Sequence, residues 1–133
     1  MNDRYLFRAK RKNWRELPKE IWWVEGYYAY FKQNDNHCIY YEVDGFTLVC
    51  DIDVSTLCVC TGLKDKNGKM IWENDITLRT SVTGVHKGKI FYGEEGAFCQ
   101  RDFESLFENL LLNSESYFEV IGNIFDNPEL MHE

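Results

Sequence analysis

The spacing of apolar and polar positions predicts a chain made almost entirely of short strands. From residue 57 to residue 64, larger apolar side chains alternate with smaller or polar ones, which is the period of a strand that turns one face to a core. Strand-like segments are also expected at residues 4–10, 22–31, 39–43, 46–52, 70–72, 76–79, 85–92, 97–100 and 117–125. Residues 13–20 contain Leu17-Pro18, and because proline cannot donate to a central ladder we expect a loop there.

Two dipeptides mark hairpin tips between these segments. Asn67-Gly68 and Asp44-Gly45 are preferred pairs for the two-residue type I′ turn, in which both central residues have positive φ. Lys87-Gly88 predicts a further turn inside residues 85–92. The strands are therefore expected to be antiparallel and joined by hairpins.

One segment has the helical period instead. Its apolar residues, at positions i, i+3, i+4, i+7 and i+8, are Phe103, Leu106, Phe107, Leu110 and Leu111. Asp102 is placed as the N-cap, and Glu104 lies in the first turn, where the helix dipole favours a negative charge. We therefore expect a short helix that packs its apolar stripe on a sheet.

Length and composition fit one ordinary folded domain. The chain has 133 residues, of which 44% are hydrophobic and 28% charged, and such a length buries about two-thirds of its unfolded surface. The fold class predicted is mainly β with one short helix: a small, partly open SH3-like barrel of hairpin-joined antiparallel strands. We expect residues 1–133 to form a single domain.

Four sequence runs resemble one known family. They are RAKRK at residues 8–12, WVEGYY at 23–28, TGLKDKNGKMIWENDI at 61–76 and EVIGNIFDNPEL at 119–130, and together they resemble the YopX-like family of phage and prophage proteins. The resemblance implies a small β-rich fold and a phage setting, and it carries no catalytic residues. Two departures stand out: Asn74 occupies a position where the family commonly has glycine, and residues 13–22 look like an insertion into a short hairpin loop. Asparagine tolerates positive φ, so the first departure is mild.

The cysteines show no framework. Their number is odd and no CxxC spacing occurs among Cys38, Cys50, Cys58, Cys60 and Cys99, so neither a disulfide scaffold nor an ordinary zinc site is indicated. We expect free thiols that pack as small hydrophobic side chains, and no cofactor. The alternative is a metal clamp by Cys58 and Cys60, which share a strand face, with Cys50 or Cys99.

Catalytic signatures are missing as well. The chain has no P-loop, no GxGxxG after a strand, no GxSxG elbow and no HExxH, so we do not expect an enzyme. His37, His86 and His132 fall in predicted turns or at the tail without a recognised ligand spacing, and we expect surface histidines there. No apolar run is long enough to cross a bilayer, and no leader-like segment follows the basic residues at the amino end. We therefore expect a cytoplasmic protein of the bacterial host, with no membrane partner.

Charge and aromatic content suggest the kind of partner. Residues 1–20 carry seven Lys and Arg against three Asp and Glu, a net charge of +4, while residues 21–133 carry eight against nineteen, a net charge of −11, which together give the −7 of the whole chain. A basic arm on an acidic body can meet phosphate, or an acidic patch on a second copy. Segment 21–31 is aromatic on both strand faces, and a small core can take only one of them.

Two hypotheses follow. The favoured one is a non-enzymatic, homo-oligomeric protein-interaction module whose partner is a second copy or another phage or host protein. The alternative is a nucleic-acid-associated small β-barrel that uses the basic arm, where cations neutralise phosphates and a tryptophan stacks on a base. A sequence pI of about 5.0 argues against the alternative. The residues expected to form the interaction surface are Arg8, Lys10, Arg11, Lys12, Trp14, Arg15, Trp22, Trp23, Tyr27 and Tyr28.

Overall fold

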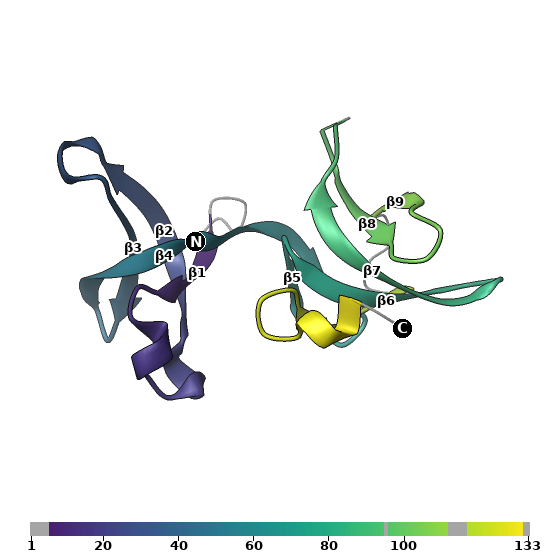
Figure 1. Cartoon of the computed structure of the whole chain (residues 1–133), viewed down its shortest axis with the longest axis horizontal. Coiled ribbons are helices and arrows are strands. Elements are labelled where there is room, and N and C mark those ends of the chain that lie inside the picture. Colours follow the sequence, from purple (N-terminus) through teal and green to yellow (C-terminus); the bar gives the residue numbers. More distant parts are fainter. Residues whose placement is uncertain (1–5, 95, 112–116, 132–133) are drawn as a thin grey trace. The chain divides into compact units, whose positions relative to one another are not determined.

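The computed structural model describes residues 6–94, 96–111 and 117–131, and in them the chain is mainly β (Figure 1). The strands are β1 (Phe7–Arg11), β2 (Trp23–Phe31), β3 (Asn36–Val43), β4 (Phe46–Lys64), β5 (Met70–Trp72), β6 (Asp75–Ser81), β7 (Gly84–Tyr92), β8 (Phe98–Asp102), β9 (Glu108–Leu110) and β10 (Phe118–Asn123). Short 3₁₀ helices are η2 (Trp14–Glu16), η3 (Lys19–Ile21), η4 (Lys32–Asn34) and η5 (Pro128–Met131). Among these described residues, no helix has the length and apolar character needed to span a membrane.

Contacts concentrate in two compact units, Met1–Cys60 and Thr61–Glu133. We call them unit 1 and unit 2 and describe each by itself. Whether they fold as the single domain expected from the length stays a prediction.

Unit 1 is a small barrel closed by one long strand. The sheet order is β1-β2-β3-β4, and β4 also pairs with β1. β4 can close the barrel because it is long, with 19 residues. Its first part pairs with β3 over Phe46–Asp51, and its later part pairs with β1 at Ile52–Val59. The β1–β4 register shifts between Arg8 and Lys10, which is where the strands bend around the barrel. The predicted SH3-like, partly open barrel is confirmed.

The face of β2 that lies inward is now defined. Val24 and Gly26 are buried and Tyr28 is half-buried, whereas Glu25 and Tyr27 between them are exposed. Val24 joins a core cluster with Ala9, Ile39 and Ile52, and Tyr28 packs against it. Alternation along β2 thus follows the predicted strand period, with the Val24 side toward the core.

Unit 2 is a second antiparallel sheet, in the order β10-β6-β7-β8-β9, and β5 pairs with the end of β4. Its core cluster is formed by Ile71, Ile90, Leu111 and Phe118. These residues come from β5, β7, β10 and the residue after β9, so the core joins strands that are up to 47 positions apart in sequence. Non-local pairs of this kind are invisible to a strand-by-strand prediction.

The two predicted hairpin tips differ. Asp44 and Gly45 both have positive φ, 51° and 83°, as a type I′ turn requires. At the other tip Gly68 has φ 79°, but Asn67 is not among the described residues with positive φ, so the type I′ turn predicted there was wrong. Hydrogen bonds from Gly68 N to the Asp65 carbonyl (3.0 Å) and from Asp65 N to the Lys69 carbonyl (2.8 Å) instead define a three-residue loop that ends in a left-handed glycine.

The turn predicted at Lys87-Gly88 was also wrong. β7 runs through Gly88, which is paired with Thr77 on β6 and Asp102 on β8. A Cβ at Gly88 would lie 2.3 Å from the carbonyl oxygen of Arg101. The glycine therefore serves the close approach of a neighbouring strand rather than a turn.

The helix predicted over residues 103–111 is absent, and β9 occupies part of that segment. Asp102 does receive hydrogen bonds at its Oδ1 from the amides of Glu104 (2.8 Å) and Ser105 (3.1 Å), as an N-cap would. The chain then leaves the helical path because Leu106 has φ 63°, and residues 108–110 pair with β8. Residues 108–110 form backbone hydrogen bonds with the edge of β8 instead of continuing a helix, and most of the apolar residues of the predicted helix stay exposed.

The substitution of asparagine for glycine at position 74 is accommodated as expected. Asn74 has φ 71°, a conformation that asparagine adopts more readily than most residues.

Candidate functional site

The basic arm of unit 1 is folded around its own tryptophans. Lys10 is only 2% exposed, and its Nζ lies 3.9 Å from the centroid of the Trp14 ring, 4.5 Å from that of Trp22 and 5.6 Å from that of Trp23. Tryptophan faces carry negative charge density and attract a desolvated ammonium. The three tryptophan rings form a cage around the Lys10 ammonium. Lys10, which was expected from the sequence on the interaction surface, is therefore a buried residue inside this cage.

Residues 13–22 supply two walls of the cage, Trp14 and Trp22. Trp14 donates its indole N–H to Asp53 Oδ2 (3.1 Å), and Trp22 donates its own to the Leu17 carbonyl (2.9 Å). The two rings meet edge to face with centroids 4.8 Å apart. Each indole thus has both its ring and its N–H engaged within unit 1.

Arg11 is fixed by β4 and by the end of η3. Its Nε donates to the Ile21 carbonyl (2.9 Å), one terminal nitrogen lies 3.1 Å from Cys50 Sγ, and its guanidinium stands over the Tyr41 ring. Partial burial by itself disfavours the charged form, but hydrogen bonding to Tyr41 and Cys50 outweighs it, so the pKa of Arg11 is raised. The guanidinium is a fixed cation.

The remaining predicted surface residues divide by exposure. Lys12, Arg15 and Tyr27 are exposed, while Arg8, Trp23 and Tyr28 are half-buried. Arg8 lies over the Trp23 ring and Arg15 over the Trp14 ring. The structure thus brings the ten residues into one unit but leaves only three of them fully available to a partner.

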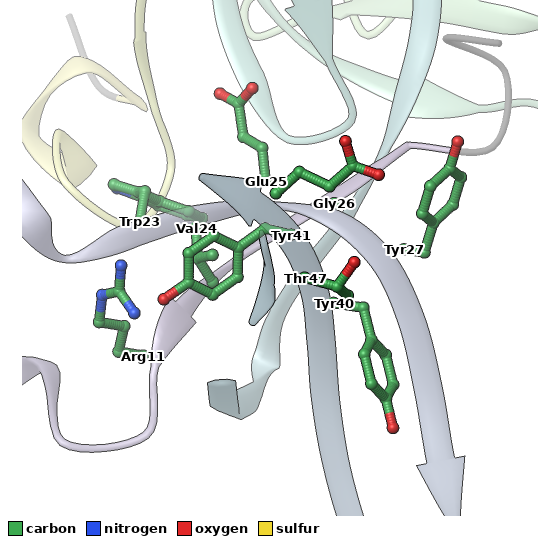
Figure 2. Close-up of a pocket in the computed structure, with 10 residues that line it drawn as sticks. Arg11, Trp23, Val24, Glu25, Gly26, Tyr27, Tyr40, Tyr41 and Thr47 are labelled. Carbon is green, nitrogen blue, oxygen red and sulfur yellow. The ribbon is translucent and has the colours of Figure 1, made fainter. Parts of the chain in front are cut away.

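A groove opens where β2 changes its partner (Figure 2). β2 pairs with β1 up to Gly26 and with β3 from Tyr27, and the pairing of β3 with β2 ends at Tyr40. A Cβ at Gly26 would lie 2.0 Å from the Tyr40 carbonyl oxygen, so only glycine fits at this split. The groove has a volume of ≈ 430 Å³ and is lined by Arg11, Trp23, Val24, Glu25, Gly26, Tyr27, Tyr40, Tyr41, Glu42 and Thr47.

The groove combines aromatic walls with opposite charges. In Figure 2, Arg11, Trp23 and Tyr41 lie together on one side, and Tyr27 and Tyr40 are on the other. Glu25 and Glu42, two exposed carboxylates, also belong to the lining. Such a surface suits a protein segment with apolar and cationic side chains, since tyrosine and tryptophan supply area and hydroxyl or N–H groups at little entropic cost.

Sequence reasoning missed a second feature, the apolar surface beside the groove. Tyr27, Tyr40 and Val49 are opposite one another across β2, β3 and β4, so they form a row on one face. Exposed apolar side chains lie on both faces of this sheet in unit 1: Tyr27, Phe31 and Val49 are on the face of the row, whereas Tyr30, Val43, Phe46 and Leu48 are on the opposite face, with Phe46 at 72%. The alternation in residues 46–52 predicted a half-buried strand, but it could not show that the hairpin extends past the core.

All five cysteines are free thiols; Cys50 is half-buried and the other four are buried. Within the residues that the structure describes, no cluster of three or more His, Cys, Asp and Glu is placed to hold a metal.

Comparisons with known proteins agree with this fold. The chain resembles the crystal structure of protein EF1440 from Enterococcus faecalis, with a TM-score of 0.53 and 23% sequence identity over 95% of this chain and 96% of that one. No curated protein matches. The family model described as YopX protein matches residues 6–132, which is nearly the whole chain. The chain therefore belongs to the YopX family.

Proposed function

We propose that this chain is a phage or prophage protein that acts in the bacterial cytoplasm as a homo-oligomeric protein-interaction module. The observation that carries the proposal is the exposed apolar row next to the aromatic groove, in which Tyr27 and Val49 flank Tyr40 on one face of β2–β4. Soluble monomers seldom expose contiguous apolar patches larger than a few hundred Å², and tyrosine is enriched where interfaces form.

Charge complementarity favours a second copy as the occupant of this face. The exposed cations Lys12 and Arg15 stand on the basic arm, and the exposed carboxylates Glu25 and Glu42 line the groove. Two copies can therefore place unlike charges around an apolar contact. Association of this kind weakens as salt rises, because exposed charges are screened.

The alternative function, nucleic-acid association through the basic arm, has less support. Lys10 is enclosed by the tryptophans that a base would have to stack on, and Arg11 is bonded to the Ile21 carbonyl and Cys50. Lys12, Arg15 and Lys19, the exposed cations among the described residues of the arm, give a small phosphate-binding surface on a chain of net charge −7. Electrophoretic mobility with single- and double-stranded DNA at two salt concentrations distinguishes the two functions.

Light scattering after size exclusion tests self-association. We expect a mass of at least twice 15.8 kDa at low salt, falling toward the monomer as salt increases. A clean monomer at tens of micromolar in low salt contradicts the proposal.

Two matched variants locate the interface. Val49 and Val85 are 56% and 64% exposed but lie in different units. Val49→Ser should raise the dissociation constant by about tenfold or more, since burying a valine is worth about 1.5–3 kcal/mol, and Val85→Ser should leave it unchanged. Dissociation by Val85→Ser alone would place the interface on unit 2 and contradict the surface proposed.

A further inference from the structure

Unit 2 contains a line of acid, imidazole and hydroxyl groups that the sequence did not indicate. Asp102 Oδ2 lies 3.2 Å from His86 Nδ1. On the other side of the ring, His86 Nε2 lies 3.1 Å from Ser81 Oγ and 2.8 Å from Thr83 Oγ1. These residues come from the β6–β7 hairpin and the end of β8.

The carboxylate at the end of this line is fixed and ionised. The Asp102 side chain is 4% exposed, and its Oδ1 accepts the amides of Glu104 and Ser105. Burial alone would raise the pKa of Asp102, but these two amides and the nearby charges of His86 and Arg79 outweigh it and lower the pKa. An anionic Asp102 holds the proton of His86 on Nδ1, which leaves Nε2 as an acceptor for a hydroxyl proton.

A groove and a cation adjoin the hydroxyl of Ser81. Ser81 and Arg79 both line an open groove of ≈ 560 Å³ whose other walls include Val82, Leu110 and Phe118. Arg79 is oriented by a hydrogen bond from its Nε to Gln100 Oε1 (3.3 Å). The backbone N–H of Thr83 also points at Ser81 Oγ, at 3.2 Å. The Thr83 N–H thus holds Ser81 Oγ in place, and Arg79 brings positive charge to the groove that Ser81 lines.

We propose that Ser81, His86 and Asp102 form a nucleophile, general base and orienting carboxylate that react with carboxylic esters of small apolar acyl groups. The order of the three groups in space is that of a hydrolytic triad, which is recognised by geometry and not by sequence position. The apolar walls of the groove take the acyl chain. Ser81 is the nucleophile rather than Thr83 because Ser81 lines the groove and its hydroxyl is primary.

The reaction consists of two acyl transfers. Ser81 Oγ attacks the ester carbonyl carbon as its proton passes to His86 Nε2, and the bond to the leaving alkoxide breaks as His86 returns that proton to it. Water then attacks the acyl carbon as one of its protons passes to His86 Nε2. The bond from that carbon to Ser81 Oγ breaks as His86 returns the proton to Oγ, which releases the carboxylic acid and restores the serine hydroxyl. Asp102 stays ionised and stabilises the imidazolium. No oxidant, reductant or other co-reactant is consumed.

A covalent probe gives the most direct test. The full chain is incubated with an alkyl fluorophosphonate, which phosphonylates a serine with loss of fluoride, and intact-mass and peptide mass spectrometry locate the adduct. We expect one adduct, on Ser81, formed faster at mildly alkaline than at mildly acidic pH, because an imidazole acts as a base only when it is unprotonated. Hydrolysis of p-nitrophenyl butyrate should show the same pH profile.

Variants separate the proposed roles from simple loss of fold. Ser81→Ala should abolish the adduct, and His86→Gln should slow its formation by about 100-fold or more. Ser55→Ala, which removes a serine hydroxyl that is 2.6 Å from Asp53 Oδ1 in unit 1, should change neither rate. Circular dichroism establishes that each variant is folded.

The outcomes are decisive in either direction. No adduct on the folded wild-type chain, an adduct on Thr83 in place of Ser81, or equal rates for wild type and His86→Gln would each overturn the proposal. The test does not depend on the oligomeric state, so it can fail while the proposed interaction function stands.

Discussion

Replacing Asp65 by asparagine tests how the loop between β4 and β5 is held on unit 2. Asp65 is 2% exposed. Its Oδ1 accepts the amides of Asn67 (2.9 Å) and Lys69 (2.8 Å), and its Oδ2 accepts the amide of Val120 on β10 (2.9 Å). One carboxylate therefore shapes the loop and joins it to a strand 55 residues away.

The expected cost follows from these three bonds. Asparagine keeps one oxygen for the two loop amides but presents an NH₂ group to the Val120 N–H, so two buried donors face each other. A hydrogen bond to a charged group contributes about 1.5–3 kcal/mol, and an unsatisfied buried donor costs about 1–3 kcal/mol. We expect Asp65→Asn to lower the free energy of unfolding of unit 2 by about 2–4 kcal/mol.

Urea melts provide the measurement. Trp72, which is 4% exposed, reports on unit 2 by fluorescence, and hydrogen exchange at the Val120 and Lys69 amides should lose protection. Asp44→Asn is the matched control, because Asp44 is an exposed aspartate at the other hairpin tip with φ 51°; it should change stability by less than about 0.5 kcal/mol. An equally small change for Asp65→Asn would refute the assigned role of the carboxylate.

The remaining predictions concern backbone strain, the thiols and pH. Gly68→Val should cost about 1–3 kcal/mol in urea melts because φ is 79°, although nothing lies within 4 Å of the new Cβ; a loss below a few tenths would be inconsistent with that strain. Thiol titration in denaturant without reductant should find five cysteines, with Cys50 reacting first in the native protein, and one zinc per chain in elemental analysis would overturn the expectation that the protein is metal-free. The pKa of Asp53 is lowered chiefly by the Ser55 hydroxyl, with partial burial opposing and the Trp14 N–H assisting, so its stabilising contribution is complete above the unfolded pKa and is lost as pH falls through the lower folded pKa. Tryptophan fluorescence of unit 1 should shift at that acid step in the wild type and not in Asp53→Asn.

Local chemistry decided much of the fold. Period-two alternation predicted the strands because a strand with one buried face requires it. The positive φ of Asp44, Gly45, Gly68 and Asn74 was readable because few residues tolerate the left-handed region. The resemblance of four runs to the YopX family was likewise sufficient to assign the family, because those runs extend from β1 to η5.

Tertiary contacts decided the rest. The Asp65 carboxylate accepts hydrogen bonds from two amides of its own loop. These bonds stabilise a three-residue loop in place of the two-residue turn that Asn67-Gly68 prefers in isolation. Residues 108–110 form a strand despite their helical spacing of apolar residues, because they pair with the backbone N–H and C=O groups at the edge of β8. A helical spacing of apolar residues only favours a helix, whereas the backbone N–H and C=O groups must find hydrogen-bond partners in whichever structure forms.

The candidate sites depended most on tertiary structure. A cationic arm suggests an exposed surface, but Lys10 is enclosed because residues 13–22 fold their two tryptophans back over β1. Ser81, His86 and Asp102 have no motif spacing, and they meet because β6, β7 and β8 are adjacent in the sheet. Sequence thus determined most of the strand segments and the reversals at Asp44-Gly45 and Gly68. Strand pairing determined the rest, including β9 and the polar groups that lie within hydrogen-bonding distance, since pairing depends on residues far apart in the chain.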